Sequence, residues 1–193
     1  IDMDTAGDYQ GSSSDGWLNP IEGPTSAGTW YYPGGGVHLG VDRAVSVGTP
    51  IHAPADGLIV WAANPADTNG GYLGNWAGYP YGAGNNIAML VRVNDTTYFV
   101  SFSHMAQYGM TVSAGDSVSQ GDMIGLTGNS GNSSGAHCHI EIINLGSMSI
   151  SEAASQFAST ADFAWGCGWS SPSTGCDSKG STPCRERPET LIG

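Results

Sequence analysis

Two short patterns in the sequence place histidine at spacings that suit a metal or catalytic site. In GVHLGVD, Asp42 follows His38 by four residues, and in SGAHCHIEI, His139 follows His137 by two. Imidazole and carboxylate are both good ligands of Zn²⁺. The residue between the last two histidines, Cys138, leaves two possibilities open: a histidine site, or a metal site that also uses the thiolate.

Strands suit both patterns better than helices. Glycines before and after His38 disfavour a helix, and side chains on a strand alternate between its two faces. In a strand, His38 and Asp42 would share one face, as would His137 and His139, while Cys138 would point to the opposite side. Catalytic zinc commonly has about three protein ligands and one open position. The predicted ligand set is therefore His38, Asp42 and one of the two later histidines.

Each pattern also has an ordinary explanation. A His-x-x-x-Asp pair is often a solvated loop pair, and a His-x-His pair is often two surface histidines on an edge strand. The chain has only five histidines, so the presence of both patterns together favours a metal or catalytic site. His52 has no companion at ligand spacing, so we expect a structural role for it. His104 ends an apolar strand on the face of Tyr98, Val100 and Phe102, where a packed histidine is the usual case.

The elements that must position these residues are short strands separated by turn residues. Alternating and β-branched segments predict an all-β fold with a mainly antiparallel sheet and long loops. The segments 86–93 and 98–104, joined through Asn94-Asp95-Thr96-Thr97, are typical of a β-hairpin. The other predicted elements are strands at 57–63 and 139–143, a turn-rich stretch at 111–128 and one helix at 151–160.

Composition divides the chain into three parts. Residues 1–16 are polar, acidic and rich in Gly and Ser, as in a tether. Residues 17–145 are expected to form the catalytic core. Residues 146–193 contain three of the four cysteines and are expected to be a disulfide-stapled, partly helical extension packed on that core, because they are too few for a core of their own.

Overall charge excludes some classes of partner. Five Lys and Arg against seventeen Asp and Glu give a net charge of −12, so there is no basic surface for nucleic acid. No apolar run is long enough to cross a membrane. Few charges and many Gly, Ser, Thr and Asn residues are typical of a secreted or cell-surface protein. The chain begins at Ile1 without a leader, so we expect a mature monomeric fragment of a larger multidomain protein.

Further motifs accompany the histidines in a fixed order. They comprise HLGVD (38–42), GTPIHAPADGLIVWA (48–62) and the stretch from FSHMAQYG through GNSGNSSGAHCHIEI (102–142). Together they resemble the lysostaphin-type zinc metallopeptidases, which cut peptide bonds in bacterial peptidoglycan. The resemblance covers roughly residues 30–145.

The resemblance implies a role for each histidine of these motifs. His38, Asp42 and His139 would bind one Zn²⁺ ion, and His104 and His137 would be the catalytic histidines. One of these two would take the proton of the attacking water and pass it to the leaving amine, and the other would stabilise the oxyanion.

Aromatic residues near these motifs are candidates for contacts to substrate. The resemblance suggests that Tyr32 contacts the bound water or the developing oxyanion. The long irregular segment 64–85 and the loop 29–36 would line the substrate groove. The predicted groove residues are Tyr31, Tyr72, Trp76, Tyr79 and Tyr81.

Four cysteines in a secreted chain predict two disulfides. Family members usually have a large apolar residue where this chain has Cys138. We therefore expect Cys138 to be bonded to Cys184 in the extension, and Cys167 to Cys176. The alternative is that Cys138 is a small buried thiol.

The leading functional prediction is an extracellular zinc endopeptidase acting on peptidoglycan stem peptides or cross-bridges. The first alternative is a non-catalytic wall-binding or regulatory module of the same fold. The second is a zinc hydrolase of free peptides or other amides, such as a carboxypeptidase.

Overall fold

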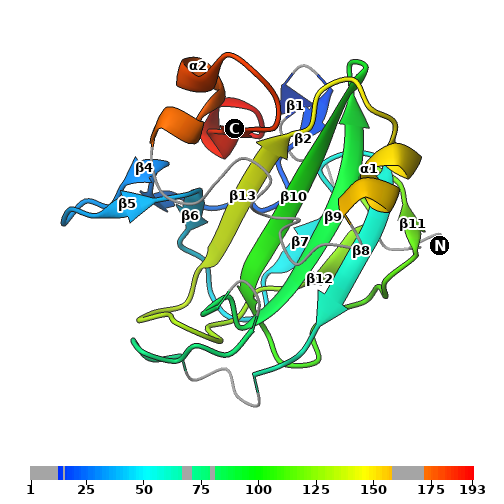
Figure 1. Cartoon of the computed structure of the whole chain (residues 1–193). Coiled ribbons are helices and arrows are strands. Elements are labelled where there is room, and N and C mark those ends of the chain that lie inside the picture. Colours follow the sequence, from blue (N-terminus) through cyan, green and yellow to red (C-terminus); the bar gives the residue numbers. More distant parts are fainter. Residues whose placement is uncertain (1–12, 15, 67–70, 79–80, 158–171) are drawn as a thin grey trace.

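A mainly antiparallel sheet dominates the computed structural model, which describes residues 13–14, 16–66, 71–78, 81–157 and 172–193. The sheet has eight strands in the order β11-β8-β9-β10-β13-β6-β3, with β14 also pairing with β13 (Figure 1). The predicted all-β class is confirmed. The strands are β3 (Thr25–Ala27), β6 (Val41–Arg43), β8 (Gly57–Ala63), β9 (Asn85–Val93), β10 (Thr96–Met105), β11 (Ser117–Val118), β13 (Cys138–Asn144) and β14 (Cys184–Glu186).

Smaller elements surround this sheet. Three two-stranded sheets pair β1 (Ser13–Ser14) with β2 (Trp17–Leu18), β4 (Trp30–Tyr31) with β5 (Val37–His38), and β7 (Pro50–His52) with β12 (Met123–Leu126). The helices are α1 (Ile150–Phe157), α2 (Cys176–Lys179) and the 3₁₀ turns η3 (Pro172–Thr174) and η4 (Pro188–Thr190). None of the helices among the described residues is long and apolar enough to cross a membrane.

The predicted hairpin forms between β9 and β10. Its loop has two residues, Asn94 and Asp95, both with positive φ (49° and 64°). Two residues in this conformation suit the right-handed twist of paired strands. The loop is shorter than the four residues suggested by the sequence, because Thr96 and Thr97 already pair with Val93 and Arg92.

The two faces of the sheet are covered differently. The main core lies on one face and includes Val41, Val100, Phe102 and Ile140, all fully buried. A smaller cluster around Ala88, Leu90, Phe99 and Ile143 lies on the other, where Ala153 of α1 packs against it. Figure 1 shows α1 lying over β8 and β9. The predicted helix is therefore present over 150–157, and its last three predicted residues lie outside the described part of the chain.

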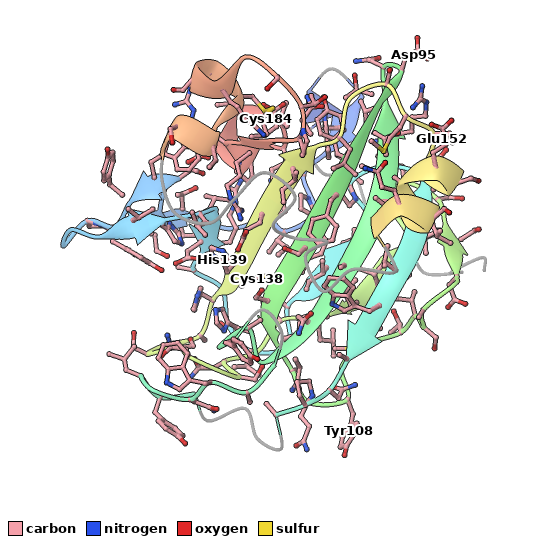
Figure 2. The ribbon with its side chains drawn as sticks, in the orientation of Figure 1. Asp95, Tyr108, Cys138, His139, Glu152 and Cys184 are labelled. Atoms are coloured by element: carbon pink, nitrogen blue, oxygen red, sulfur yellow. A yellow bond between two sulfur atoms is a disulfide. The ribbon has the colours of Figure 1, made fainter. Side chains whose placement is uncertain are left out.

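The predicted disulfide pairing is wrong. Cys184 is bonded to Cys176, and Cys138 is a buried free thiol. The register explains this outcome, since Cys184 pairs with Asn144 at the far end of β13 from Cys138 (Figure 2). Six residues of strand separate these positions by about 20 Å, far beyond the reach of a disulfide. Cys167 lies outside the described residues, but its predicted partner Cys176 is bonded to Cys184.

Candidate active site

Three predicted ligands converge at the edge where β6 meets β13. Asp42 and His139 are direct cross-strand partners, so their side chains lie on the same face. His139 Nδ1 lies 2.8 Å from Asp42 Oδ1, and His38 Nε2 lies 3.2 Å from Asp42 Oδ1. The two imidazole nitrogens are 3.1 Å apart. These three atoms therefore form a compact triangle of two nitrogens and one oxygen.

His38 reaches this triangle by a different route from the one predicted. Residues 38–42 are not one strand, because β5 ends at His38 and β6 begins at Val41. Between them, Gly40 passes so close to β13 that a Cβ there would lie 2.1 Å from the carbonyl oxygen of Ile140. A glycine is required at this point of close approach, and the bend carries His38 over Asp42.

Each histidine of the triangle is oriented by a partner on its other ring nitrogen. His38 Nδ1 donates to the carbonyl of Gly28 at 2.8 Å, and His139 Nε2 donates to Glu141 Oε2 at 2.9 Å. The facing nitrogens, Nε2 of His38 and Nδ1 of His139, both lie against Asp42 Oδ1. A bound metal would replace any proton shared there, and the partners on the far side of each ring fix which nitrogen faces the metal.

Glu141 and Arg185 are residues of the site that the sequence analysis missed. Arg185 of β14 is fully buried, and its Nη1 donates to Glu141 Oε1. Glu141 was within reach of sequence reasoning, because it lies two residues after His139 and therefore on the same strand face. Arg185 was not, since 44 residues separate it from Glu141.

The charges at the site favour a cation. Burial alone would raise the pKa of Asp42, but the hydrogen bonds from His139 and His38 hold it well below its usual range. Burial would lower the pKa of His139, yet Asp42 and Glu141 raise it to about 10. Burial would also raise the pKa of Glu141, whereas Arg185 brings it down to about 2. Two carboxylates are thus held ionised beside the imidazoles.

The donor set fits a metal ion. His38, Asp42 and His139 each offer one ligand atom, all within 4.8 Å of one another. In a tetrahedral site with bonds of 2.0–2.2 Å, ligand atoms lie about 3.3 Å apart, close to the separations of 3.1 and 3.2 Å made by His38 Nε2. This group can therefore hold a metal.

His104 enters the site through an irregularity in β10. The sequence placed His104 on the face of Phe102, and this prediction is wrong. The β9–β10 register shifts between Phe102 and Met105, and His104 has a positive φ of 61°. The extra residue of a β-bulge reverses the alternation. Phe102 and Met105 both enter the main core, while Ser103 and His104 both line the site.

The second histidine pair stands beside the triangle. The rings of His104 and His137 are 4.6 Å apart between centroids, and His137 Nε2 lies 3.7 Å from Asp42 Oδ1. His104 Nδ1 donates to the carbonyl of Ser130 at 2.7 Å, and His137 Nδ1 to that of Gly135 at 2.8 Å. Both rings therefore keep Nε2 for other partners.

Burial keeps His104 uncharged. Desolvation, followed by repulsion from His137 and His139, lowers the pKa of His104 to about 3. Its imidazole is neutral at physiological pH and offers a lone pair at Nε2.

A cleft of about 200 Å³ opens over His38, His104 and His139. Among its walls are Tyr32, Tyr81, Gly82 and Asn132. The Tyr32 ring packs on the His38 imidazole with centroids 4.2 Å apart. Burial, with help from Asp42 and Glu141, raises the pKa of Tyr32, so its phenol keeps its proton.

Comparison with known proteins identifies the family. Peptidase family M23 matches residues 36–150, which is more than half of the chain. The chain belongs to peptidase family M23. The match includes all five candidate metal and catalytic residues, but it leaves out Tyr32 and everything after residue 150.

Several characterised proteins resemble this M23 chain. Lysostaphin of Staphylococcus staphylolyticus is 32% identical over 165 residues, 82% of this chain and 30% of that protein. The peptidoglycan DD-endopeptidase ShyA of Vibrio cholerae is 34% identical over 109 residues, 56% of this chain and 21% of that protein. The glycyl-glycine endopeptidase ALE-1 of Staphylococcus capitis is 33% identical over 135 residues, 68% of this chain and 32% of that protein. The chain thus spans a third or less of the length of these relatives.

Among solved structures, the catalytic domain of lysostaphin from Staphylococcus simulans is 31% identical, with a TM-score of 0.49, and covers 66% of this chain and 84% of that domain.

The aromatic groove residues predicted for this M23 chain fall into different places. Tyr81 is strongly exposed and is also a wall residue of the cleft. Tyr31, Tyr72 and Trp76 are exposed but stand outside the cleft lining. Tyr79 lies outside the described residues. His52, predicted to be structural, donates a hydrogen bond from Nδ1 to the carbonyl of Gly121 at 3.0 Å and is not part of the metal triangle.

Proposed function

We propose that this chain is a zinc-dependent endopeptidase that hydrolyses peptide bonds in bacterial peptidoglycan. The observation that carries the proposal is a His-Asp-His triangle with two further histidines directly beside it, at a cleft lined by His38, His104 and His139. The relatives add the substrate class, because they include a peptidoglycan DD-endopeptidase and a glycyl-glycine endopeptidase.

Zinc is the metal that we propose for the triangle. Imidazole nitrogens and a carboxylate oxygen are ligands that zinc prefers, and three protein ligands leave a position open. His38, Asp42 and His139 would hold the ion. When bound, it would supply a Lewis acid that polarises the scissile carbonyl and lowers the pKa of a bound water.

His104 and His137 are proposed to move the proton. Their Nδ1–H groups are engaged by backbone carbonyls, so Nε2 is the working atom of each ring. A neutral Nε2 accepts the proton of the attacking water, and a protonated Nε2 donates to the oxyanion or to the leaving amine. His137 Nε2 lies 3.7 Å from Asp42 Oδ1, so this nitrogen is beside the proposed metal position.

Tyr32 is proposed to assist at the oxyanion. Its ring stands against a ligand histidine at the cleft wall, and its phenol is protonated at neutral pH. A phenol O–H is a hydrogen-bond donor that could reach the developing negative charge. Tyr81, on another wall of the same cleft, is a candidate for substrate contact.

The cleft also bears on the substrate. Gly82 and Ala83 form part of one wall, and a Cβ on Gly82 would lie 2.9 Å from the Cβ of Asn132. Walls built from such small residues leave room for a peptide backbone with small side chains. The proposed substrate lies outside the bacterial cytoplasm, so we propose extracellular or cell-surface action, by a monomer within a larger protein.

Hydrolysis of purified cell walls tests the function. We expect the protein to lower the turbidity of walls from a susceptible bacterium, and to release muropeptides with new amino termini that mass spectrometry identifies. His137→Ala is the matched control, because it leaves the metal ligands in place. Absence of both zinc and lysis would instead favour a wall-binding module, and release of single terminal amino acids would favour a carboxypeptidase.

A further inference from the structure

The final segment of the chain, residues 172–193, lies beyond the region that matches the family. We propose that this C-terminal segment positions both histidine ligands of the metal centre, Arg185 acting through Glu141 on His139 and Glu189 acting through Thr29 and Gly28 on His38. The proposal rests on the proposed metal-binding role of the two histidines. Arg185 and Glu189 are positioning residues, since neither contacts the metal-binding atoms.

The first connection runs along one face of β13. Strand β14 pairs with β13 so that Arg185 is opposite Ile143. Ile143, Glu141 and His139 alternate with the core residues of β13, so all three share the face on which Arg185 lies. Arg185 donates to Glu141 Oε1, and the other oxygen, Oε2, accepts from His139 Nε2 at 2.9 Å.

This arrangement holds the Glu141 carboxylate at both oxygens. One oxygen is engaged by the guanidinium and the other by the ligand imidazole, so the carboxylate has a defined orientation. The Arg185 side chain is fully buried, and that of Glu141 is 8% exposed. A buried carboxylate that loses its cation is strongly disfavoured. Removing Arg185 would therefore take the donor away from Glu141 Oε1 and free the carboxylate to rotate, which disturbs its hydrogen bond with His139.

The second connection reaches His38 from η4. Glu189 Oε2 accepts from the backbone N–H of Thr29 at 2.7 Å, and Glu189 Oε1 accepts from the Thr29 hydroxyl at 2.5 Å. Thr29 follows Gly28, whose carbonyl accepts from His38 Nδ1 at 2.8 Å. A Cβ on Gly28 would lie 3.0 Å from Glu189 Oε2, which shows how closely the carboxylate packs on this backbone.

The segment is itself anchored close to both connections. The Cys176–Cys184 disulfide ends at the residue before Arg185. Pro188, immediately before Glu189, is buried, and Ile192 is part of the main core. Arg185 and Glu189 are thus presented from fixed backbone.

The two connections are selective for the metal ligands. The catalytic histidines are oriented instead by the carbonyls of Ser130 and Gly135, which belong to the loop before β13. Loss of Arg185 or Glu189 should therefore weaken metal binding directly, and should reduce turnover in proportion to the metal that is lost.

Metal affinity of the full chain tests the first connection. Partners of a ligand histidine typically change metal affinity by about 10–100-fold, so we expect Arg185→Met to weaken Zn²⁺ binding by that factor in a chelator competition. We also expect an altered visible spectrum of the Co²⁺ form. Arg185→Lys should recover part of the affinity, because it restores the charge without the planar fork. The matched control is Arg187→Met, since Arg187 is half exposed and pairs with Asp177.

A milder variant keeps the test decisive if Arg185→Met fails to fold. Glu189→Gln should weaken Zn²⁺ binding by about tenfold, whereas Glu152→Gln, at an exposed position of α1, should change nothing. Folded Glu189→Gln and Arg185→Lys proteins with the wild-type affinity and Co²⁺ spectrum would overturn the proposal. Failure of the proposed function gives a different result, because the wild-type protein itself would then bind no zinc or release no muropeptides.

Discussion

The two faces of strand β13 have different roles. One face carries His139, which belongs to the proposed metal site, and Glu141, which links it to Arg185. The other carries Cys138, Ile140 and Ile142, all within the main core. Residues one position apart in the sequence therefore belong either to the chemistry or to the packing, and the alternation of the strand keeps the two functions apart.

Cys138 illustrates this separation. It stands between two site histidines in the sequence, yet it is completely buried on the core face. Burial, with the charge of Asp42, raises the pKa of its thiol far above the usual value. A neutral thiol in apolar surroundings is a poor metal ligand and a poor nucleophile. Cys138 is therefore a packing residue, the alternative that the sequence analysis left open.

The largest loss of zinc and of turnover should follow substitution of His139 on the polar face of β13. We expect His139→Ala to lose bound zinc and to lower turnover by about 10⁴-fold, because a catalytic metal contributes several kcal/mol to transition-state stabilisation. Metal content by atomic absorption and release of muropeptides measure the two losses. His52→Ala serves as the control histidine and should keep one zinc per chain.

Loss of either proposed catalytic histidine should separate metal binding from turnover. We expect His104→Ala and His137→Ala each to retain zinc and to lose at least about 100-fold in turnover, as is typical for removal of a general acid or base. The same two assays apply. An active His104→Ala enzyme would show that the bulge in β10 has no catalytic purpose.

A substitution on the core face should show the reverse pattern. Ile140→Ala removes a fully buried side chain, so we expect the free energy of unfolding to fall by about 2–5 kcal/mol. Zinc content and turnover of the folded protein should stay near the wild-type values. Denaturant unfolding gives the first quantity. Loss of zinc from a folded Ile140→Ala protein would mean that the two faces are not independent.

The pH dependence of stability should report on His104. Its pKa is about 3 in the folded protein and about 6.5 when unfolded. The unfolded chain therefore takes up a proton first as the pH falls, and the folded state loses stability below pH 6.5. Between pH 7 and pH 5 this amounts to about 2 kcal/mol. Denaturation of the metal-free protein should show a shallower loss for His104→Gln, and parallel curves would contradict the assignment.

The smallest effect is expected at the Cys138 thiol. Because the group is buried and neutral, we expect no alkylation of Cys138 by iodoacetamide in the folded protein at pH 8, and complete alkylation in denaturant. Peptide mass mapping distinguishes the two states. Rapid alkylation of the folded protein at this position would place Cys138 outside the core.

Much of the site was predictable because its spacing is local. The alternation of His139 and Cys138 follows from the geometry of any strand, and the hairpin at Asn94-Asp95 follows from turn chemistry. The ordered motifs predicted the family and brought the five site residues together as one set. These features depend on residues close to one another in the sequence, where steric preferences of the chain decide.

Other features depended on contacts between distant segments. His104 lines the cleft because of a bulge at which it has a positive φ. The sequence does not predict this bulge, since a positive φ is uncommon for any residue other than glycine. Cys184 pairs with Cys176, and not with Cys138, because the β13–β14 register separates the latter two. Arg185 meets Glu141 for the same reason of register. By itself, the sequence determined which groups could do chemistry and on which side of a strand they lie. Only the tertiary structure decided which distant groups meet them, because register and close approach arise from packing of the whole chain.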